Sequence, residues 1–343
     1  MNDVAPLPPE VAPRGRWVGR GLLLLALAAT AWVGWREFDH RAAVREARAA
    51  GFKWEVREPI ALIRADWRAA FHKETWTGSY WSLDVGYGRD LASLRPLLLR
   101  LRPTWLNAWR CKDANLDALR GLAGLQSLNL SGCTALQNVD ALKGLSGLKY
   151  LDLFDCLALQ NVDALKSLSR LQKLDLARCT ALQNGDALQT LTGLETLDLN
   201  GCTALQNVDA LKGLSGLQWL NLGGCTALQN VDTLKGLSGL QMLSLSGCTA
   251  LQNVDALSSL SGLKTLQLAN CRALQNVDGL KGLSGLEILD LGGCPALQNV
   301  DALKGLSGLK ELDLRACPKL PATAVAGLRA ALPKTRINSD HDP

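Results

Sequence analysis

A cysteine-marked repeat of 23 residues dominates this chain. Each copy reads leucine, two variable residues, leucine, one residue, leucine, two residues and cysteine, as in Leu148, Leu151, Leu153 and Cys156. A fixed period of this length predicts a solenoid, in which each repeat stacks on its neighbours to bury a shared core. The nine cysteines that close the pattern are Cys133, Cys156, Cys179, Cys202, Cys225, Cys248, Cys271, Cys294 and Cys317.

Each repeat predicts one short strand and one return segment. Leu151 and Leu153 alternate with Tyr150 and Asp152, and this period of two places the leucines on one face. In-register stacking of the repeats then gives a parallel sheet with about 4.8 Å between strands. The stretch after each cysteine, most often TALQNVDALKGLSG, predicts brief helical or 3-10 turns on the opposite, convex side.

The return segment supplies further buried positions and a turn signal. Leu136, Val139 and Leu142 are expected to point inward, and Gly185, which replaces the valine in one repeat, predicts a local weak spot. A glycine two residues after the last of these leucines is expected to stop the turn early. An aspartate stands before each predicted turn, and we expect it to cap free N–H groups there. These aspartates are Asp140, Asp163, Asp186, Asp209, Asp232, Asp255, Asp278 and Asp301.

This pattern resembles the leucine-rich repeat family in its short bacterial form, with cysteine where many members carry asparagine. The resemblance covers about Leu98 to Cys317, and a shorter first coil around Leu106 and Cys111 has Ala108 at a leucine position. The resemblance implies an α/β solenoid that forms an arc with a parallel β-sheet on its concave side. It also implies, most often, a protein-binding role.

Composition divides the chain into unequal parts. Nine of the ten tryptophans lie in the first 110 residues, and the net charge is +1 over residues 1–35, +5 over 36–110 and −1 over 111–343. Because the repeats carry no basic stripe, the sequence does not favour nucleic acid as a partner. The predicted parts are a polar tail (1–16), an apolar segment (17–35), a connector rich in Trp and Arg that caps the solenoid (36–78), the solenoid itself (79–317) and a C-terminal cap with a polar tail (318–343).

The apolar segment 17–35 predicts a single transmembrane helix. Nineteen helical residues extend about 28 Å, close to a hydrocarbon core of roughly 30 Å, and Trp32 and Trp35 suit the membrane interface. The alternative is a signal peptide cleaved after the small residues Ala29 and Ala31. Basic residues near the two ends favour repeats inside the cell, whereas the short preceding tail favours repeats outside. We prefer the extracytoplasmic side, and the cytoplasmic side stays open.

The two ends of the solenoid need covers. In the connector, one helix is expected from about Glu37 to Ala50. A second has an apolar face that either docks on a membrane or partner or, as we favour, caps the first coil. Those apolar residues are Ile60, Ile63, Trp67 and Phe71, followed by a strand with Tyr80, Leu83 and Val85. At the other end, Leu328, Leu332 and Ile337 predict a closing helix and a last strand.

No motif predicts catalysis, a cofactor or a metal site. The three histidines lie outside the repeats, and no nucleophile has a base at a motif spacing. Zinc is disfavoured because it needs two close ligand pairs, which a ladder does not provide. Disulfides between adjacent coils are within reach at a Cα separation of roughly 5 Å. However, parallel side chains and an odd number of cysteines favour a ladder of buried free thiols.

The outward strand positions predict a protein-binding surface on the concave face. These positions differ between coils, whereas the return segment is nearly constant. Exposed large apolar residues are costly unless covered, aromatic anchors suit interfaces, and aspartates favour a basic partner. Neutral drift would produce the same variability in a structural or adhesive spacer of the cell envelope, which is the alternative function. The predicted contact residues are Tyr150, Asp152, Phe154, Lys173, Asp175, Asp198, Trp219, Met242, Ile288 and Asp290.

Overall fold

The computed structural model of the chain describes residue 45 and residues 53–57, 80–85, 90–112 and 116–341. The expected membrane segment 17–35 and both expected connector helices lie outside the described residues, apart from Arg45, which is helical. Within the described ranges, no helix is both long and apolar enough to cross a bilayer.

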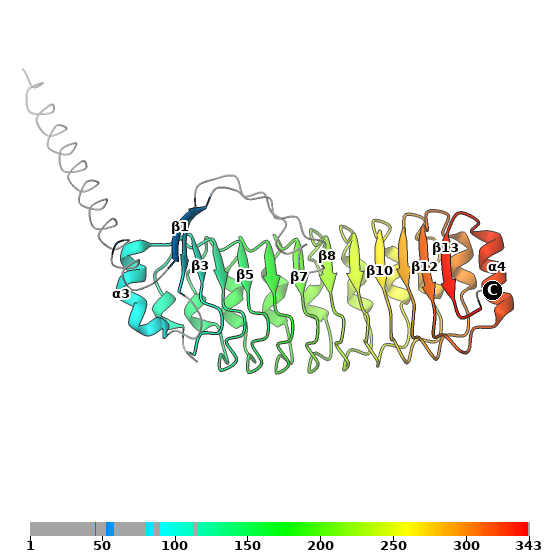
Figure 1. The fold of residues 1–343 in the computed structure, drawn as a ribbon, viewed down its shortest axis with the longest axis horizontal. Helices are drawn as coiled ribbons and strands as arrows, with labels where there is room; N and C mark the ends of the chain where they lie inside the picture. Colours follow the sequence, from blue (N-terminus) through cyan, green and yellow to red (C-terminus); the bar gives the residue numbers. More distant parts are fainter. Residues whose placement is uncertain (1–44, 46–52, 58–79, 86–89, 113–115, 342–343) are drawn as a thin grey trace, which may run out of the picture.

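The described residues form one 13-stranded sheet whose strands follow one another in chain order (Figure 1). β1 and β2 pair antiparallel, and β2 to β13 are all parallel. This arrangement confirms the predicted stack of parallel strands. The strands are β1 Lys53–Arg57, β2 Tyr80–Asp84, β3 Trp105–Asn107, β4 Ser127–Asn129, β5 Tyr150–Asp152, β6 Lys173–Asp175, β7 Thr196–Asp198, β8 Trp219–Asn221, β9 Met242–Ser244, β10 Thr265–Gln267, β11 Ile288–Asp290, β12 Glu311–Leu314 and β13 Arg336–Ser339.

The core is a continuous column of leucines that runs through every coil. The middle leucine of each strand lies beside its equivalent in the next coil, as Leu220 does between Leu197 and Leu243. The inward leucines and cysteines of the repeats are buried throughout. Because each coil contributes the same side chains at the same height, the core extends without a break from one end cap to the other.

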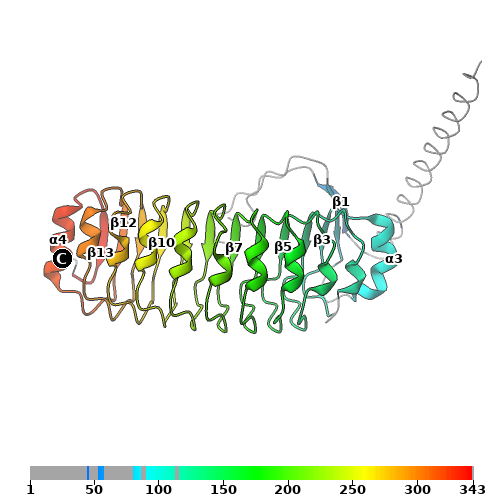
Figure 2. The same cartoon turned by 180° about the vertical axis from the view of Figure 1, so that it is seen from behind.

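Among the residues that the structure describes, the convex side carries nine 3-10 turns. Their course behind the sheet can be followed in Figure 2. The valine and leucine positions beside these turns are buried, which confirms the inward assignment of Leu136, Val139 and Leu142. The turns are η1 Asp117–Leu119, η2 Asp140–Leu142, η3 Asp163–Ser167, η4 Asp186–Thr190, η5 Asp209–Leu211, η6 Asp232–Gly236, η7 Asp255–Ser259, η8 Asp278–Leu280 and η9 Asp301–Gly305.

Glycine shortens some of these turns, as expected, but does not do so everywhere. Gly144 follows a three-residue turn with a left-handed φ of +91°, a conformation that glycine adopts at low cost. Where Ser167 or Thr190 stands at this position, the turn continues to five residues. Gly236 and Gly305 also lie in five-residue turns, so glycine permits the early stop without imposing it.

The prediction that aspartates cap the turns is wrong. Each aspartate is the first residue of its turn, and the N-cap position before it is held by a residue such as Val139 or Val162, which makes no side-chain capping hydrogen bond. The asparagine two residues earlier accepts the hydrogen bond instead: Asn161 Oδ1 lies 2.7 Å from Asp163 N. Asp163 points to solvent and pairs with Lys166 at 2.6 Å. Seven coils share the asparagine bond, through Asn138, Asn161, Asn207, Asn230, Asn253, Asn276 and Asn299.

Helix α3 (Leu91–Leu101) covers the N-terminal end of the core. Asp90 starts this helix by accepting a hydrogen bond from Ala92 N at 2.9 Å, and the helix buries Leu91 and Leu98. The leucine spacing assigns this segment to the repeats and does not predict a helix there. The first coil that follows has Ala108 buried at a leucine position, as expected.

The C-terminal end closes as predicted. Helix α4 (Ala322–Ala331) buries Val325 and Leu328. β13 adds a last strand with Ile337 buried. At the opposite end, buried Leu83 and Val85 confirm the strand expected there, whereas its antiparallel partner β1, inside the predicted connector, was not foreseen.

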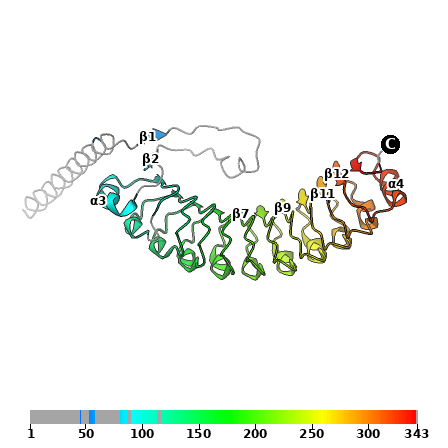
Figure 3. The ribbon, with the colours of Figure 1, turned by 60° about the horizontal axis from the view of Figure 1, so that its bottom comes forward.

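The solenoid bends into an arc (Figure 3). The parallel sheet lines the inner, concave side, and the 3-10 turns lie on the outer side. This geometry directs the outward side chains of successive strands toward one shared face.

Candidate protein-binding face

Two rows of side chains define the concave face. Strand alternation turns the first and third residues of each strand away from the leucine core, and the in-register pairing aligns them from coil to coil. We call them the first row and the central row. The first row is Ser127, Tyr150, Lys173, Thr196, Trp219, Met242, Thr265, Ile288 and Glu311, and the central row is Asn129, Asp152, Asp175, Asp198, Asn221, Ser244, Gln267, Asp290 and Asp313.

The acids of the central row hold the end of their own strands. Asp152 Oδ1 accepts a hydrogen bond from Phe154 N at 2.9 Å, and Asp175 Oδ1 accepts one from Ala177 N at 2.8 Å. Asn129, Asp198, Asn221, Asp290 and Asp313 repeat the same bond two residues on. Either asparagine or aspartate can stand at these positions because both offer the required side-chain oxygen. One carboxylate oxygen per residue is therefore committed to the fold, a role that the sequence analysis missed.

In three coils the second carboxylate oxygen of this row also has a partner: those of Asp152, Asp198 and Asp313. Asp152 Oδ2 lies 3.4 Å from the Tyr150 hydroxyl, and Asp198 Oδ2 accepts from Asn221 Nδ2 at 3.4 Å. Burial raises the pKa of Asp290. The predicted acidic face is consequently more hydrogen-bonded, and offers less free charge, than the composition suggested.

Three predicted contact residues are buried and not exposed: Asp152, Lys173 (7% exposed) and Trp219 (6% exposed). Neither Lys173 nor Trp219 belongs to the leucine core, because Leu174 and Leu220 take the inward positions beside them. Their burial therefore arises on the concave side. Strand alternation predicts the face of the sheet on which these side chains lie, but it does not determine how much of each side chain is exposed to solvent.

An aromatic and charged cluster lies at the N-terminal half of the face. Phe154 and Tyr150 are partly exposed. Arg178 from the next coil lies over the Phe154 ring, 5.8 Å from its centroid, and pairs with Asp155 at 3.1 Å. The strand pattern predicts Phe154 as a contact residue but does not indicate Arg178, because this contact joins residues about one full coil apart.

The C-terminal half of the face is the more open part. Met242 is partly exposed, and Ile288, two strands further along the sheet, is 39% exposed. Asp175, Asp198 and Asp290 are half-buried in the central row. The predicted residues thus share one face but differ widely in solvent exposure. Ile288 has the most exposed apolar side chain among them.

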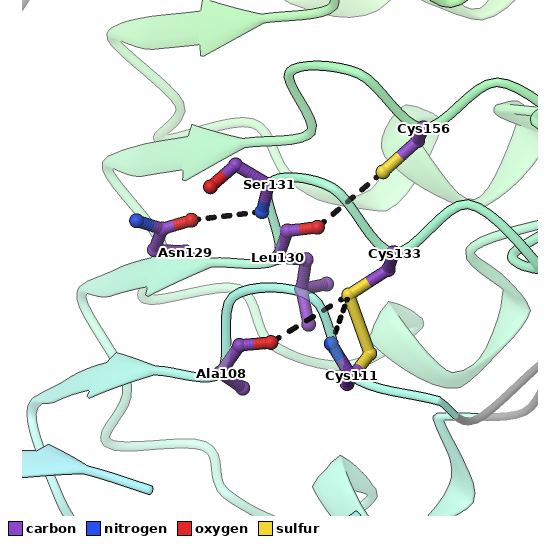
Figure 4. Close-up of a disulfide and its surroundings, with 7 residues drawn as sticks. All are labelled: Ala108, Cys111, Asn129, Leu130, Ser131, Cys133 and Cys156. Carbon is purple, nitrogen blue, oxygen red and sulfur yellow. Dashed lines mark hydrogen bonds between the residues drawn. A yellow bond between two sulfur atoms is a disulfide. The ribbon is translucent and has the colours of Figure 1, made fainter. Parts of the chain in front are cut away.

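The cysteines form the predicted column of buried thiols, with one correction. The eight from Cys156 to Cys317 are free and buried. Cys111 and Cys133, however, form a disulfide with a Cα separation of 5.1 Å (Figure 4). The tenth cysteine, Cys111, supplies the partner that an odd count of nine lacked. The first coil is one residue shorter than the others, so this pair is 22 residues apart in the sequence. In the described part of the chain, no three or more metal-binding side chains converge.

Comparison with known proteins supports the repeat assignment. The BspA type leucine rich repeat region matches the chain in six copies, over residues 115–218 and 200–320. A solved internalin of Listeria monocytogenes (inlF) is similar at 19% identity with a TM-score of 0.49, over 80% of this chain and 93% of that chain. A second internalin of the same species has 29% identity and a TM-score of 0.46, over 54% and 79% of the two chains. A comparison with curated proteins finds no match.

Proposed function

The chain belongs to the BspA-type leucine-rich repeat family, and we propose that it is a membrane-anchored, non-catalytic protein that binds another protein through its concave face. Folds of this kind generally serve as non-enzymatic scaffolds for protein interaction or adhesion. What the proposal adds is the face that binds and the residues at its centre.

The observation that carries the proposal is the apolar content of the accessible concave face. Tyr150, Phe154, Met242 and Ile288 all retain solvent contact on a single in-register sheet. Large apolar and aromatic side chains among polar neighbours are typical of the centre of a protein interface. The partly exposed asparagine and glutamine side chains of the central row, Asn129, Asn221 and Gln267, lie on the same face and offer hydrogen-bond partners.

A matched pair of exposed aliphatic residues tests the choice of face. Ile288 and Leu157 are both 39% exposed, but Leu157 follows the cysteine of its coil and lies off the concave sheet. Ile288→Lys combined with Met242→Lys should reduce capture of the partner at least about tenfold, because the interface would then bury unpaired charges. Leu157→Lys should leave capture unchanged.

The measurement is a quantitative pull-down from the source cells, with the wild-type chain and the variants compared protein by protein. Circular dichroism of each variant checks that the solenoid is intact. Proteins retained equally by the concave-face variant and by Leu157→Lys would reject this face as the binding site.

The uniform return segments favour a second candidate, a structural or adhesive spacer. In-frame deletion of residues 249–271, one 23-residue period, separates the two candidates. The deletion removes β10 and would bring Met242 and Ile288 from roughly 10 Å apart to roughly 5 Å, at one strand spacing per coil. A spacer should tolerate this change, whereas a shaped binding face should lose its partner.

Membrane attachment through residues 17–35 is the remaining part of the proposal. Removal of these residues should move the protein from the membrane fraction to the soluble fraction. Reporter fusions after residue 343 would then assign the side of the membrane. We favour the extracytoplasmic side, and an active cytoplasmic reporter would reverse that choice.

A further inference from the structure

The thiols of the ladder are hydrogen-bond donors. From Cys156 to Cys317, each sulfur lies 3.1 to 3.4 Å from the carbonyl oxygen of the residue 26 positions earlier, as Cys156 does from Leu130. The S–H group therefore satisfies a buried carbonyl in the preceding coil. From Leu130 to Leu268 this carbonyl also accepts a hydrogen bond from the backbone N–H of the cysteine three residues on, as Leu130 O does from Cys133 N, so the thiol supplies a second bond. Oxidation of such a thiol would remove that second hydrogen bond in a dry core, at a cost in stability.

The same thiols are poorly reactive. Burial raises the pKa of Cys156, Cys202 and Cys248 to about 12. Because the thiolate is the reactive form, roughly one molecule in 10⁵ would carry it at any one of these positions at pH 7. Eight positions of the ladder are thus held in the reduced state by both hydrogen bonding and burial.

The first two cysteines differ from the rest. Their sequence separation is 22 instead of 23, and the two sulfurs are bonded. Cys133 Sγ accepts a hydrogen bond from Cys111 N at 3.2 Å and lies 3.5 Å from the Ala108 carbonyl oxygen (Figure 4). That carbonyl occupies the place of the acceptors used by the other thiols. Cys133 consequently has a partner in both redox states: the Cys111 sulfur when oxidised and the Ala108 carbonyl when reduced.

Cys111 is also the most accessible cysteine of the column. It is 5% exposed, whereas Cys317 at the opposite end is 3% exposed and the cysteines between them are 0% exposed. It lies at the end of the first coil, which packs against another full coil on one side only. In a solenoid, coils are stabilised mainly by their neighbours, so the terminal coil opens most readily.

We propose that Cys111 and Cys133 form a reversible redox cross-link that fastens the first coil to the solenoid, while the eight other cysteines remain thiols. The proposal goes beyond partner binding and does not depend on it. It assigns a covalent on–off control to residues 90–111, which include helix α3 and strand β3.

The chemistry is thiol–disulfide exchange with a small-molecule disulfide such as oxidised glutathione. The Cys111 thiolate attacks one sulfur of the oxidant and expels one thiolate. Cys133, as its thiolate, then attacks Cys111 Sγ and expels the second. The two cysteines lose two protons and two electrons, and the oxidant becomes two thiols. In the reverse direction, the released Cys133 thiolate takes up a proton from solvent, and the resulting S–H group donates a hydrogen bond to the Ala108 carbonyl oxygen.

Thiol mapping tests which cysteines pair. The full chain is equilibrated with oxidised glutathione, unfolded in the presence of iodoacetamide without a reductant, and digested for mass spectrometry. We expect one linked peptide pair containing Cys111 and Cys133 and alkylation of the other eight cysteines. Alkylated Cys111 and Cys133, or a linked pair that contains any cysteine from Cys156 to Cys317, would overturn the proposal.

Hydrogen exchange tests the effect on the first coil. After reduction with dithiothreitol, amides of residues 90–111 should exchange up to roughly 300-fold faster, the factor expected from the loss of a cross-link with a sequence separation of 22. Cys111→Ala should exchange at the fast rate with or without dithiothreitol. Cys248→Ala and the amides of β12 to β13 serve as controls that dithiothreitol should not affect. Equal exchange of residues 90–111 in the oxidised and reduced protein would refute the control function.

Discussion

Gly185 is the one position in the valine column of the return segments that lacks a side chain, and filling it should stabilise the solenoid. Its backbone has φ −118° and ψ 26°, close to the −117° and 28° of Val139 in an earlier coil. A β-branched residue therefore fits without backbone strain. Gly185 is buried, as are the valines at this place in the other coils.

The expected gain for Gly185→Val follows from burial and from the unfolded state. Full burial of a valine side chain contributes about 1.5–3 kcal/mol, and the loss of glycine's freedom in the unfolded chain contributes about 0.4–1 kcal/mol. Against this, an added Cβ would lie 3.0 Å from Leu188 Cδ1, so this flexible methyl group must shift. Repacking of one side chain reduces the gain to about 1–2 kcal/mol.

Urea unfolding followed by circular dichroism measures this gain as a higher midpoint. Val208→Gly, at the same place one coil later, is the matched control. It should lower the free energy of unfolding by about 2–3 kcal/mol, since it removes the same burial. If Val208→Gly destabilises as expected but Gly185→Val leaves the midpoint unchanged or lower, Leu188 already fills the space, and the argument from an empty site is wrong.

Three further changes test separate parts of the structure. Leu222→Ala, at a fully buried ladder position, should lower the free energy of unfolding by roughly 2–5 kcal/mol in urea unfolding, because it leaves a cavity in the core. Coils are coupled mainly to their neighbours, so the coils near this cavity should unfold first. Asn161→Ala should lower the free energy of unfolding by about 1 kcal/mol, because it removes the hydrogen bond from Asp163 N to Asn161 Oδ1. Asp163→Ala removes only an exposed ion pair and should change the free energy of unfolding by less than about 0.5 kcal/mol. Asp290→Asn keeps the oxygen that accepts the hydrogen bond from Gly292 N. It replaces a carboxyl whose pKa is raised in the folded protein by burial. Since the wild-type carboxyl stabilises the fold only when protonated, the variant should be more stable at pH 7, and this advantage should vanish as the pH falls through the folded pKa toward the unfolded value near 3.9.

The repeat pattern predicted the solenoid well because one coil determines all the others. Leu151 and Leu153 imply a strand, and the 23-residue period then implies the same strand in every coil, in register. Helix α3 was missed because residues 91–101 are rich in leucine and adjoin the repeats, so their spacing was assigned to the solenoid. The antiparallel strand β1 was missed because its pairing partner lies more than twenty residues away in the chain.

Side-chain roles were predicted less well, since they depend on contacts that the period does not encode. Asp163 has the residue type of a cap, but the turn begins one position too early for its side chain to reach a free N–H. The burial of Trp219 cannot be obtained from strand alternation, which gives direction and not accessibility. The pairing of Cys111 with Cys133 joins the one pair of successive cysteines that is 22 instead of 23 residues apart. In each case the deviation arises where the local geometry departs from the average repeat.

The separation of dissimilar ends from interchangeable inner coils has a genetic consequence. In the described part of the chain, helices α3 and α4 and the terminal strands occur once each, while the coils between them repeat a nearly constant amino-acid sequence. Unequal crossing-over between such copies would insert or remove whole turns and preserve the reading frame as well as both termini. Close relatives are therefore expected to vary in length by multiples of 23 residues, with the distance between their two ends changing by one strand width per step.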